Sequence, residues 1–133
     1  MNPIKVLIVD DDSIVRDLLV TYLQFNGFAT KAACSGEEAI VTLDEERFHV
    51  VITDLIMGEV NGHEVVRYAK GLDPKTRLIL ITGNCQEENI NKAIDCGTDD
   101  FFCKPLCLED LLQSLPSPVP SPPDCQTESA LFE

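Results

Sequence analysis

Short, almost purely aliphatic runs recur along the chain and are the feature that most restricts its fold. Three of them, at residues 4–9, 49–53 and 77–82, consist mainly of β-branched and aliphatic residues. Each run is too short for a buried helix and too apolar for a strand with one face in water, so each is predicted to be a strand buried on both faces. Residues 28–33 and 99–103 are weaker candidates, expected at the periphery of the same sheet.

The segments between these runs carry apolar residues at helical spacing. Ser13 and Ser35 precede the first two segments as candidate N-caps, and Pro116 ends the last. Regular alternation of strands and helices predicts a parallel sheet with helices on both faces, joined by right-handed crossovers. The predicted helices lie at about residues 14–23, 39–43, 65–69, 86–96 and 106–115.

The chain has 133 residues, which is the size of one compact domain. The composition changes at Pro116, because residues 116–123 hold five of the eight prolines. Proline cannot continue a helix, so residues 1–115 are expected to form the domain and residues 116–133 a disordered Pro- and Ser-rich tail.

Charge and hydropathy exclude several classes of function. The net charge is -13, with 23 acidic against 10 basic residues. Such a surface repels a phosphate backbone, so direct binding to nucleic acid is not expected. No apolar run approaches the roughly 20 residues of a membrane span, and no basic region precedes a hydrophobic one at the start. We therefore expect a cytoplasmic protein without membrane contact.

Cysteines are frequent, but their spacing does not indicate a metal site. No CxxC pair is present, and only His49 and His63 could join the cysteines as ligands. Reduced thiols without a role are expected. The six cysteines are Cys34, Cys85, Cys96, Cys103, Cys107 and Cys125.

Acidic residues follow two of the predicted buried strands. Asp10, Asp11 and Asp12 follow the first strand, and Asp54 follows the third. A helix cap accounts for Asp12 or Ser13, whereas the adjacent charges of Asp10 and Asp11 repel unless a cation lies between them. Because neighbouring parallel strands end at one edge of a sheet, Asp10, Asp11 and Asp54 are predicted to converge there. A set of oxygen ligands of this kind suits Mg²⁺ better than zinc or copper.

The fourth and fifth predicted strands add a hydroxyl and an ammonium group to the same edge. The fourth ends in Thr82, and Lys104 follows the fifth. Taken alone, Thr82 would be a strand-end cap and Lys104 a solvated surface charge. Carboxylates, a hydroxyl and an ammonium group at four strand ends together suit one task, which is to hold a phosphoryl group and its metal ion.

In order and spacing these residues resemble the receiver domain of two-component response regulators, of the single-domain, chemotaxis-regulator-like kind. Residues 6–13 resemble its first strand and acidic pair, residues 54–57 its phosphoacceptor loop, and Lys104 with Pro105 its final signature. The resemblance covers about residues 5–115. The expected fold is therefore α/β and flavodoxin-like, a doubly wound five-stranded parallel sheet of order 2-1-3-4-5 with five helices.

The resemblance assigns chemical roles to the acidic residues. It implies that Asp54 accepts a phosphoryl group from a phosphohistidine and forms an acyl phosphate. Asp10, Asp11, Asp54 and the backbone carbonyl of Ile56 would hold Mg²⁺. The expected protein is thus a phosphoacceptor switch and not an enzyme, beyond catalysing its own phosphotransfer and autodephosphorylation.

The resemblance also implies a switch. Thr82 and Lys104 would contact the phosphoryl oxygens, and phosphorylation would draw Thr82 toward them while the aromatic ring of Phe101 turns inward. The signal would leave through the face made by the fourth helix, the fifth strand and the fifth helix. The Lys104-Pro105 bond is expected to be cis.

Two departures from the family pattern accompany these expectations. Gly58 stands where the family usually has proline, so the loop after Asp54 should be more flexible. Ile56 and Asn84 occupy the variable positions that modulate phosphoryl lifetime, and Ile56 cannot position water.

His49 and His63 are expected to be bystanders rather than relay histidines.

The implied partners are a histidine kinase or a histidine phosphotransfer protein, docking near the first helix, and a downstream protein target. A phosphorylation-dependent homodimer remains open.

Two other functions also remain open. One is a phosphohydrolase of the haloacid-dehalogenase type, whose nucleophile would lie on the first strand. The other is a receiver-like binding module that works without phosphorylation.

Overall fold

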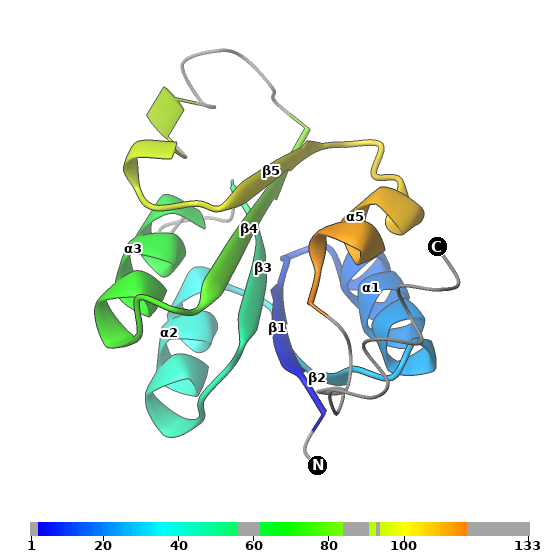
Figure 1. The fold of residues 1–133 in the computed structure, drawn as a ribbon, viewed down its shortest axis with the longest axis horizontal. Helices are drawn as coiled ribbons and strands as arrows, with labels where there is room; N and C mark the ends of the chain where they lie inside the picture. Colours follow the sequence, from blue (N-terminus) through cyan, green and yellow to red (C-terminus); the bar gives the residue numbers. More distant parts are fainter. Residues whose placement is uncertain (1–2, 56–61, 84–90, 93, 117–133) are drawn as a thin grey trace, which may run out of the picture.

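The computed structural model describes residues 3–55, 62–83, 91–92 and 94–116. Within these ranges the chain forms one sheet of five parallel strands in the order β2-β1-β3-β4-β5 (Figure 1). The predicted α/β class, strand order and strand positions are therefore confirmed. The strands are β1 (Lys5–Val9), β2 (Ala29–Ala33), β3 (Val50–Asp54), β4 (Arg77–Thr82) and β5 (Asp100–Cys103).

Four helices lie within the described parts of the chain: α1 (Ser13–Phe25), α2 (Gly36–Glu45), α3 (Gly62–Leu72) and α5 (Leu108–Ser114). The fourth predicted helix, at residues 86–96, falls mostly outside the described residues. At its end the Cys96 amide donates to the Lys92 carbonyl at 3.0 Å, and Gly97 follows with a φ of 103°. A positive φ favours glycine, which is why Gly97 can stop the helix there.

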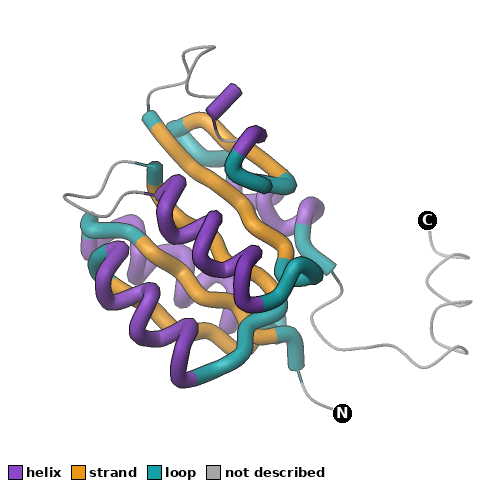
Figure 2. The backbone as a smooth tube through the Cα atoms, turned by 90° about the vertical axis from the view of Figure 1, so that its left-hand side faces the viewer, coloured by secondary structure: helices purple, strands orange, loops and turns teal. Residues whose placement is uncertain are grey.

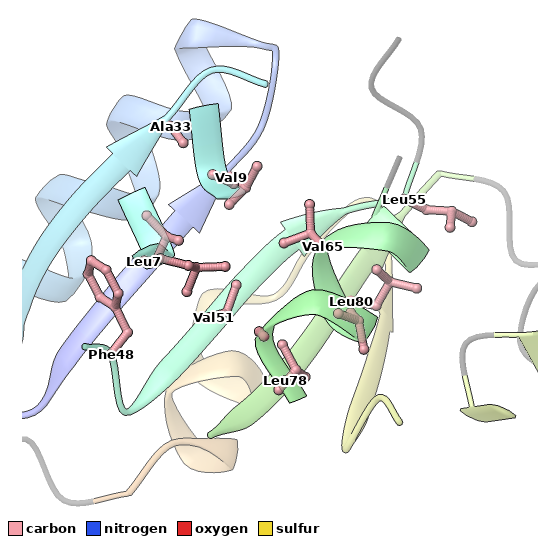
Figure 3. Close-up of a cluster of buried hydrophobic side chains, with 13 residues drawn as sticks. Leu7, Val9, Ala33, Phe48, Val51, Leu55, Val65, Leu78 and Leu80 are labelled. Atoms are coloured by element: carbon pink, nitrogen blue, oxygen red, sulfur yellow. The ribbon is translucent and has the colours of Figure 1, made fainter. Parts of the chain in front are cut away.

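The helices lie on opposite faces of the sheet, as Figures 1 and 2 show. Two apolar layers of side chains hold them there. On one face, α2 and α3 pack through residues such as Ala39 and Val65 onto Leu7, Val51 and Leu80 of the strands (Figure 3). On the other face, α1 and α5 cover the alternate side chains of the same strands. Successive strand residues point to opposite faces, so β1, β3 and β4 are buried almost throughout.

The helix starts differ from the predictions in detail. Of the two candidate caps of α1, Asp12 and Ser13, Asp12 is the N-cap, and its Oδ1 accepts the Ile14 amide at 2.9 Å. Ser35 is the N-cap of α2, as predicted, and accepts the Glu38 amide at 3.1 Å. Helix α5 begins two residues later than predicted, after Cys107. No helix in the described parts of the chain is long and apolar enough to cross a bilayer.

Candidate functional site

The carboxyl ends of β1, β3, β4 and β5 carry the polar residues of the candidate site. Asp10 follows β1, Asp54 ends β3, Thr82 ends β4 and Lys104 follows β5. Backbone hydrogen bonds hold these ends in register, since the Leu55 amide donates to Ile81 at 3.0 Å and the Lys104 amide to Thr82 at 2.8 Å. The sheet therefore places residues that are distant in sequence at one edge, as the topology requires.

Three carboxylates meet at this edge. One oxygen each from Asp10, Asp11 and Asp54 lies within 4.8 Å of the others. Asp10 is 3% exposed, whereas Asp11 is exposed. The Oδ1 atom of Asp10 accepts the Asp12 amide at 2.9 Å, which fixes its orientation. The cluster is thus buried on the Asp10 side and open to solvent on the Asp11 side.

Lys104 supplies a positive charge to this cluster. Its Nζ lies 3.2 Å from Oδ2 of Asp54 and 3.6 Å from Oδ2 of Asp10. Burial by itself would lower the pKa of Lys104, but the charges of Asp54 and Asp10 outweigh it, so that the pKa is raised. Lys104 therefore stays an ammonium ion directed at Asp54. The bond between Lys104 and Pro105 is cis, as predicted.

The charge of Lys104 does not balance the three carboxylates. Burial raises the pKa of Asp10 above its usual value, and the charges of Asp54 and Asp11 raise it further. The hydrogen bond from the Asp12 amide and the charge of Lys104 lower this pKa, but they do not cancel the rise. A second cation in the cluster would relieve this repulsion. Carboxylate oxygens with one open side are the donor set that Mg²⁺ prefers, because it keeps several water ligands. Asp10, Asp11 and Asp54 therefore fit a magnesium ion.

Thr82 ends β4 at this edge of the sheet, and Phe101 lies on the neighbouring strand β5. Thr82 is 1% exposed. Phe101 pairs with Leu80 across β4 and β5 and is half-buried against the apolar layer under α2 and α3. The fourth predicted metal ligand, the backbone carbonyl of Ile56, and the departures Gly58 and Asn84 lie outside the described residues.

Sequence reasoning missed two residues that position the site. Arg16 on α1 donates from its guanidinium to the Asp10 carbonyl at 2.8 Å. Gly62, the first residue of α3, packs so closely that a Cβ there would lie 2.4 Å from the Asp54 carbonyl oxygen. Its amide donates to the Leu55 carbonyl at 2.8 Å. In the sequence Gly62 precedes the helix predicted at residues 65–69, and only the fold shows what it contacts.

Both histidines make their described contacts away from the carboxylate cluster. Nδ1 of His49 accepts the Lys5 amide at 2.9 Å, at the opposite end of β3 from Asp54. His63 lies on α3 beside Cys96. Cys103 is disulfide-bonded, so the prediction of reduced thiols is wrong for this residue. Of the other described cysteines, Cys34, Cys96 and Cys107 are free.

Comparison with known proteins agrees with this geometry. The sequence model of the response regulator receiver domain matches residues 6–116. The response regulator MprA of Mycolicibacterium vanbaalenii is 33% identical over 110 residues, which are 83% of this chain and 48% of MprA. The chain thus spans about half the length of this relative.

Solved structures of response regulators and their receiver domains also resemble this chain. A CheY-like response regulator receiver domain protein from Methanospirillum hungatei superposes with a TM-score of 0.82 at 28% identity, over 85% of this chain and 90% of that one. A response regulator from Burkholderia pseudomallei, solved with a phosphorylated aspartic acid, calcium ion and citrate, gives a TM-score of 0.78 at 25% identity. It covers 98% of this chain and 75% of that one.

Proposed function

Because this chain belongs to the response regulator receiver domain family of two-component systems, we propose that it is a phosphorylation switch whose acceptor is Asp54. The observation that carries the proposal is the position of the Asp54 carboxylate. It ends a buried strand, beside two further carboxylates and 3.2 Å from the Lys104 ammonium group. A nucleophile with a fixed cation beside it is what phosphoryl transfer needs.

In the proposed reaction a carboxylate oxygen of Asp54 attacks the phosphorus of a phosphohistidine. The new O–P bond forms as the N–P bond breaks, and the imidazole nitrogen keeps the electron pair. Lys104 contributes a positive charge to the phosphoryl oxygens, and Asp10 and Asp11 with Asp54 would hold Mg²⁺. When bound, the metal ion neutralises phosphoryl charge. The Ile56 carbonyl is the remaining ligand that the family pattern implies.

The relative from Burkholderia pseudomallei supports this chemistry, since its structure contains a phosphorylated aspartic acid together with a divalent cation. We extend the same arrangement to this chain. Thr82 would then contact the phosphoryl oxygens, and Phe101 would turn further into the layer on which it already packs. Burial of an aromatic ring favours the inward state, although phenylalanine lacks a hydroxyl group that could add a hydrogen bond.

The phosphodonor, a histidine kinase or a histidine phosphotransfer protein, is proposed to dock on α1. Ile14 is 78% exposed there and Leu18 is 53% exposed, although both are large apolar residues. Next to them lies a groove of about 190 Å³ lined by Leu18, Lys104 and Leu106 among others. A partner seated on this surface would reach the site from the side of Lys104. A downstream protein target and a cytoplasmic location complete the proposal.

A haloacid-dehalogenase-type phosphohydrolase is less well supported. Its nucleophile would be an acid of the first strand, and Asp10 occupies that place. The Asp10 side chain is 4% exposed and its Oδ1 is occupied by the Asp12 amide, whereas the Asp54 side chain is 11% exposed. Asp54 is the better nucleophile. We therefore propose a switch that turns over only its own phosphoryl group, and not an enzyme acting on a separate substrate.

The first experiment is incubation of the full chain with Mg²⁺ and acetyl phosphate, followed by intact mass measurement. We expect the wild type to gain about 80 Da, one phosphoryl group, only when Mg²⁺ is present. Asp54→Asn should gain nothing, and the exposed Asp95→Asn should behave as the wild type. Donor consumption that survives Asp54→Asn would support the hydrolase. No adduct and no consumption would support a phosphorylation-independent binding module.

A further inference from the structure

A second cluster of reactive side chains lies between α3 and the segment that precedes β5. The Sγ atom of Cys96 lies 3.6 Å from Nδ1 of His63, and a guanidinium nitrogen of Arg67 lies 3.5 Å from the same sulfur. His63 and Arg67 are four residues apart on α3, so they project from one face of the helix. None of these residues belongs to the carboxylate cluster described above.

A base and a cation both lie within reach of the Cys96 sulfur. Burial lowers the pKa of His63, and the charges of Lys92 and Arg67 lower it further, so the imidazole is neutral at pH 7. In the tautomer protonated at Nε2, a neutral imidazole can accept the thiol proton at Nδ1. The Arg67 guanidinium then lies beside the sulfur that would become negative. A base and a fixed cation next to a cysteine are the arrangement that activates thiols.

Cys34 provides a contrast within the same chain. Its thiol donates to Oε2 of Glu38 at 3.1 Å, and this hydrogen bond together with the charge of Glu38 raises the pKa of Cys34. Cys34 is exposed, whereas Cys96 is half-buried. Exposure alone would therefore make Cys34 the more reactive thiol, while the neighbouring groups favour Cys96.

We propose that Cys96 is a nucleophilic thiol that His63 and Arg67 activate for exchange with low-molecular-weight disulfides. The thiol proton moves to Nδ1 of His63, and the sulfur attacks one sulfur of the disulfide. A new S–S bond forms to Cys96 as the original S–S bond breaks. The departing sulfur takes the electron pair and then the proton from His63. The disulfide is the oxidant, and the product is a mixed disulfide on Cys96.

Such a modification would reach the core directly. Cys96 packs against the apolar layer under α2 and α3, and Phe101 packs against the same layer. An adduct on the sulfur therefore has to be accommodated between α3 and the segment that precedes β5. The site itself does not depend on the proposed phosphoryl transfer.

The test uses the full chain, oxidised glutathione at pH 7 and peptide mapping by mass spectrometry. We expect Cys96 to form its mixed disulfide about tenfold faster than Cys34. His63→Gln and Arg67→Gln should each slow Cys96 several-fold and leave the rates at Cys34 and Cys107 unchanged. Arg67→Lys, which keeps the positive charge, should recover part of the rate. The exposed Arg47→Gln, which removes a cation paired with Asp73, is the matched control.

Equal or slower reaction of Cys96 than of Cys34 would overturn the proposal. It would also be overturned if His63→Gln and Arg67→Gln left the rate at Cys96 unchanged. The rates at Cys34 and Cys107 in the same digest report on unfolding, because an unfolded variant changes all three. A change shared by the three cysteines in both variants would count against specific activation.

Discussion

Lys104 and Asp54 contact each other across an intervening strand, with Nζ 3.2 Å from Oδ2. Asp54 ends β3 and Lys104 follows β5, while β4 lies between them in the sheet. The contact therefore depends on the register of three strands. It holds a cation at the proposed acceptor carboxylate, where the ammonium group would contribute to phosphoryl binding and also compete with a metal ion for the same oxygens.

Lys104→Met should separate these two effects. We expect phosphorylation by acetyl phosphate to slow by about 100-fold, because a fixed charge at the transferring group is lost. Mg²⁺ should bind at least as tightly as to the wild type, since the ammonium no longer repels it. Intact mass measures the first quantity and titration calorimetry the second. Parallel loss of Mg²⁺ binding would mean that Lys104 organises the carboxylates instead.

Asp10→Asn should stabilise the metal-free protein and weaken its Mg²⁺ binding. The pKa of Asp10 is raised from 3.8 in the folded state, chiefly by burial, so the ionised form costs stability above that raised pKa. At pH 7 we expect the melting temperature of Asp10→Asn to lie a few degrees above that of the wild type. As the pH falls through the raised pKa, the wild type binds a proton and the difference should close.

Asp11→Asn is the control for this effect. Asp11 is exposed, so its charge carries little desolvation cost and Asp11→Asn should raise the melting temperature little. The substitution should still weaken Mg²⁺ binding. Thermal melts with and without Mg²⁺ from pH 4 to pH 8 would compare the three proteins. A lower melting temperature for Asp10→Asn at pH 7 without Mg²⁺ would contradict the electrostatic argument.

Gly62→Ala should destabilise the fold and disturb Asp54. A Cβ at Gly62 would lie 2.4 Å from the Asp54 carbonyl oxygen and 2.9 Å from Cα of Leu55, and these backbone atoms cannot move aside independently. We expect a loss of about 1–3 kcal/mol in unfolding free energy, measured by urea denaturation, together with slower phosphorylation. Gly71→Ala is the matched control, because nothing lies within 4 Å of its Cβ position. Alanine there should stabilise the helix by about 0.5–1 kcal/mol.

The sequence predicts the elements whose burial or position leaves a direct pattern in the residues. Strands β1, β3 and β4 were predictable because burial on both faces leaves uninterrupted aliphatic runs. Asp10, Asp54, Thr82 and Lys104 were brought together by topology alone, since parallel strands end at one edge. The cap of α1 was left open between Asp12 and Ser13, because both residue types are good caps and only the backbone shows that Asp12 is the N-cap.

Contacts between distant segments left no comparable pattern. Cys96 and His63 contact each other but are 33 positions apart in the sequence, and neither belongs to a spaced motif. Gly62 gives no sign in the sequence of the Asp54 carbonyl that it faces. Such contacts depend on how α3 packs against the sheet, which periodicity does not specify.

Glu46, which follows α2, links the start of β1 to β2 and should contribute pH-dependent stability. It forms ion pairs with Lys5 and, at 3.2 Å, with Lys31. The hydrogen bonds from Lys5 and then from Lys31 lower the pKa of Glu46 from 4.5. A carboxylate whose pKa is lower in the folded state stabilises the fold above its unfolded pKa, and this contribution disappears as the pH falls through the folded value.

Glu46→Gln should therefore lower the melting temperature slightly at pH 7, with a difference that narrows below pH 4.5 and at high salt, because the pairs are partly exposed. Glu45→Gln, one position earlier and exposed, is the control and should leave the melting temperature near that of the wild type. Thermal melts at pH 7 and pH 3, and at pH 7 in 1 M salt, would measure the difference. In 1 M salt the Debye length is only about 3 Å, so the ion pairs are strongly screened. A difference that stays constant from pH 7 to pH 3 would show that Glu46 acts by packing and not by charge.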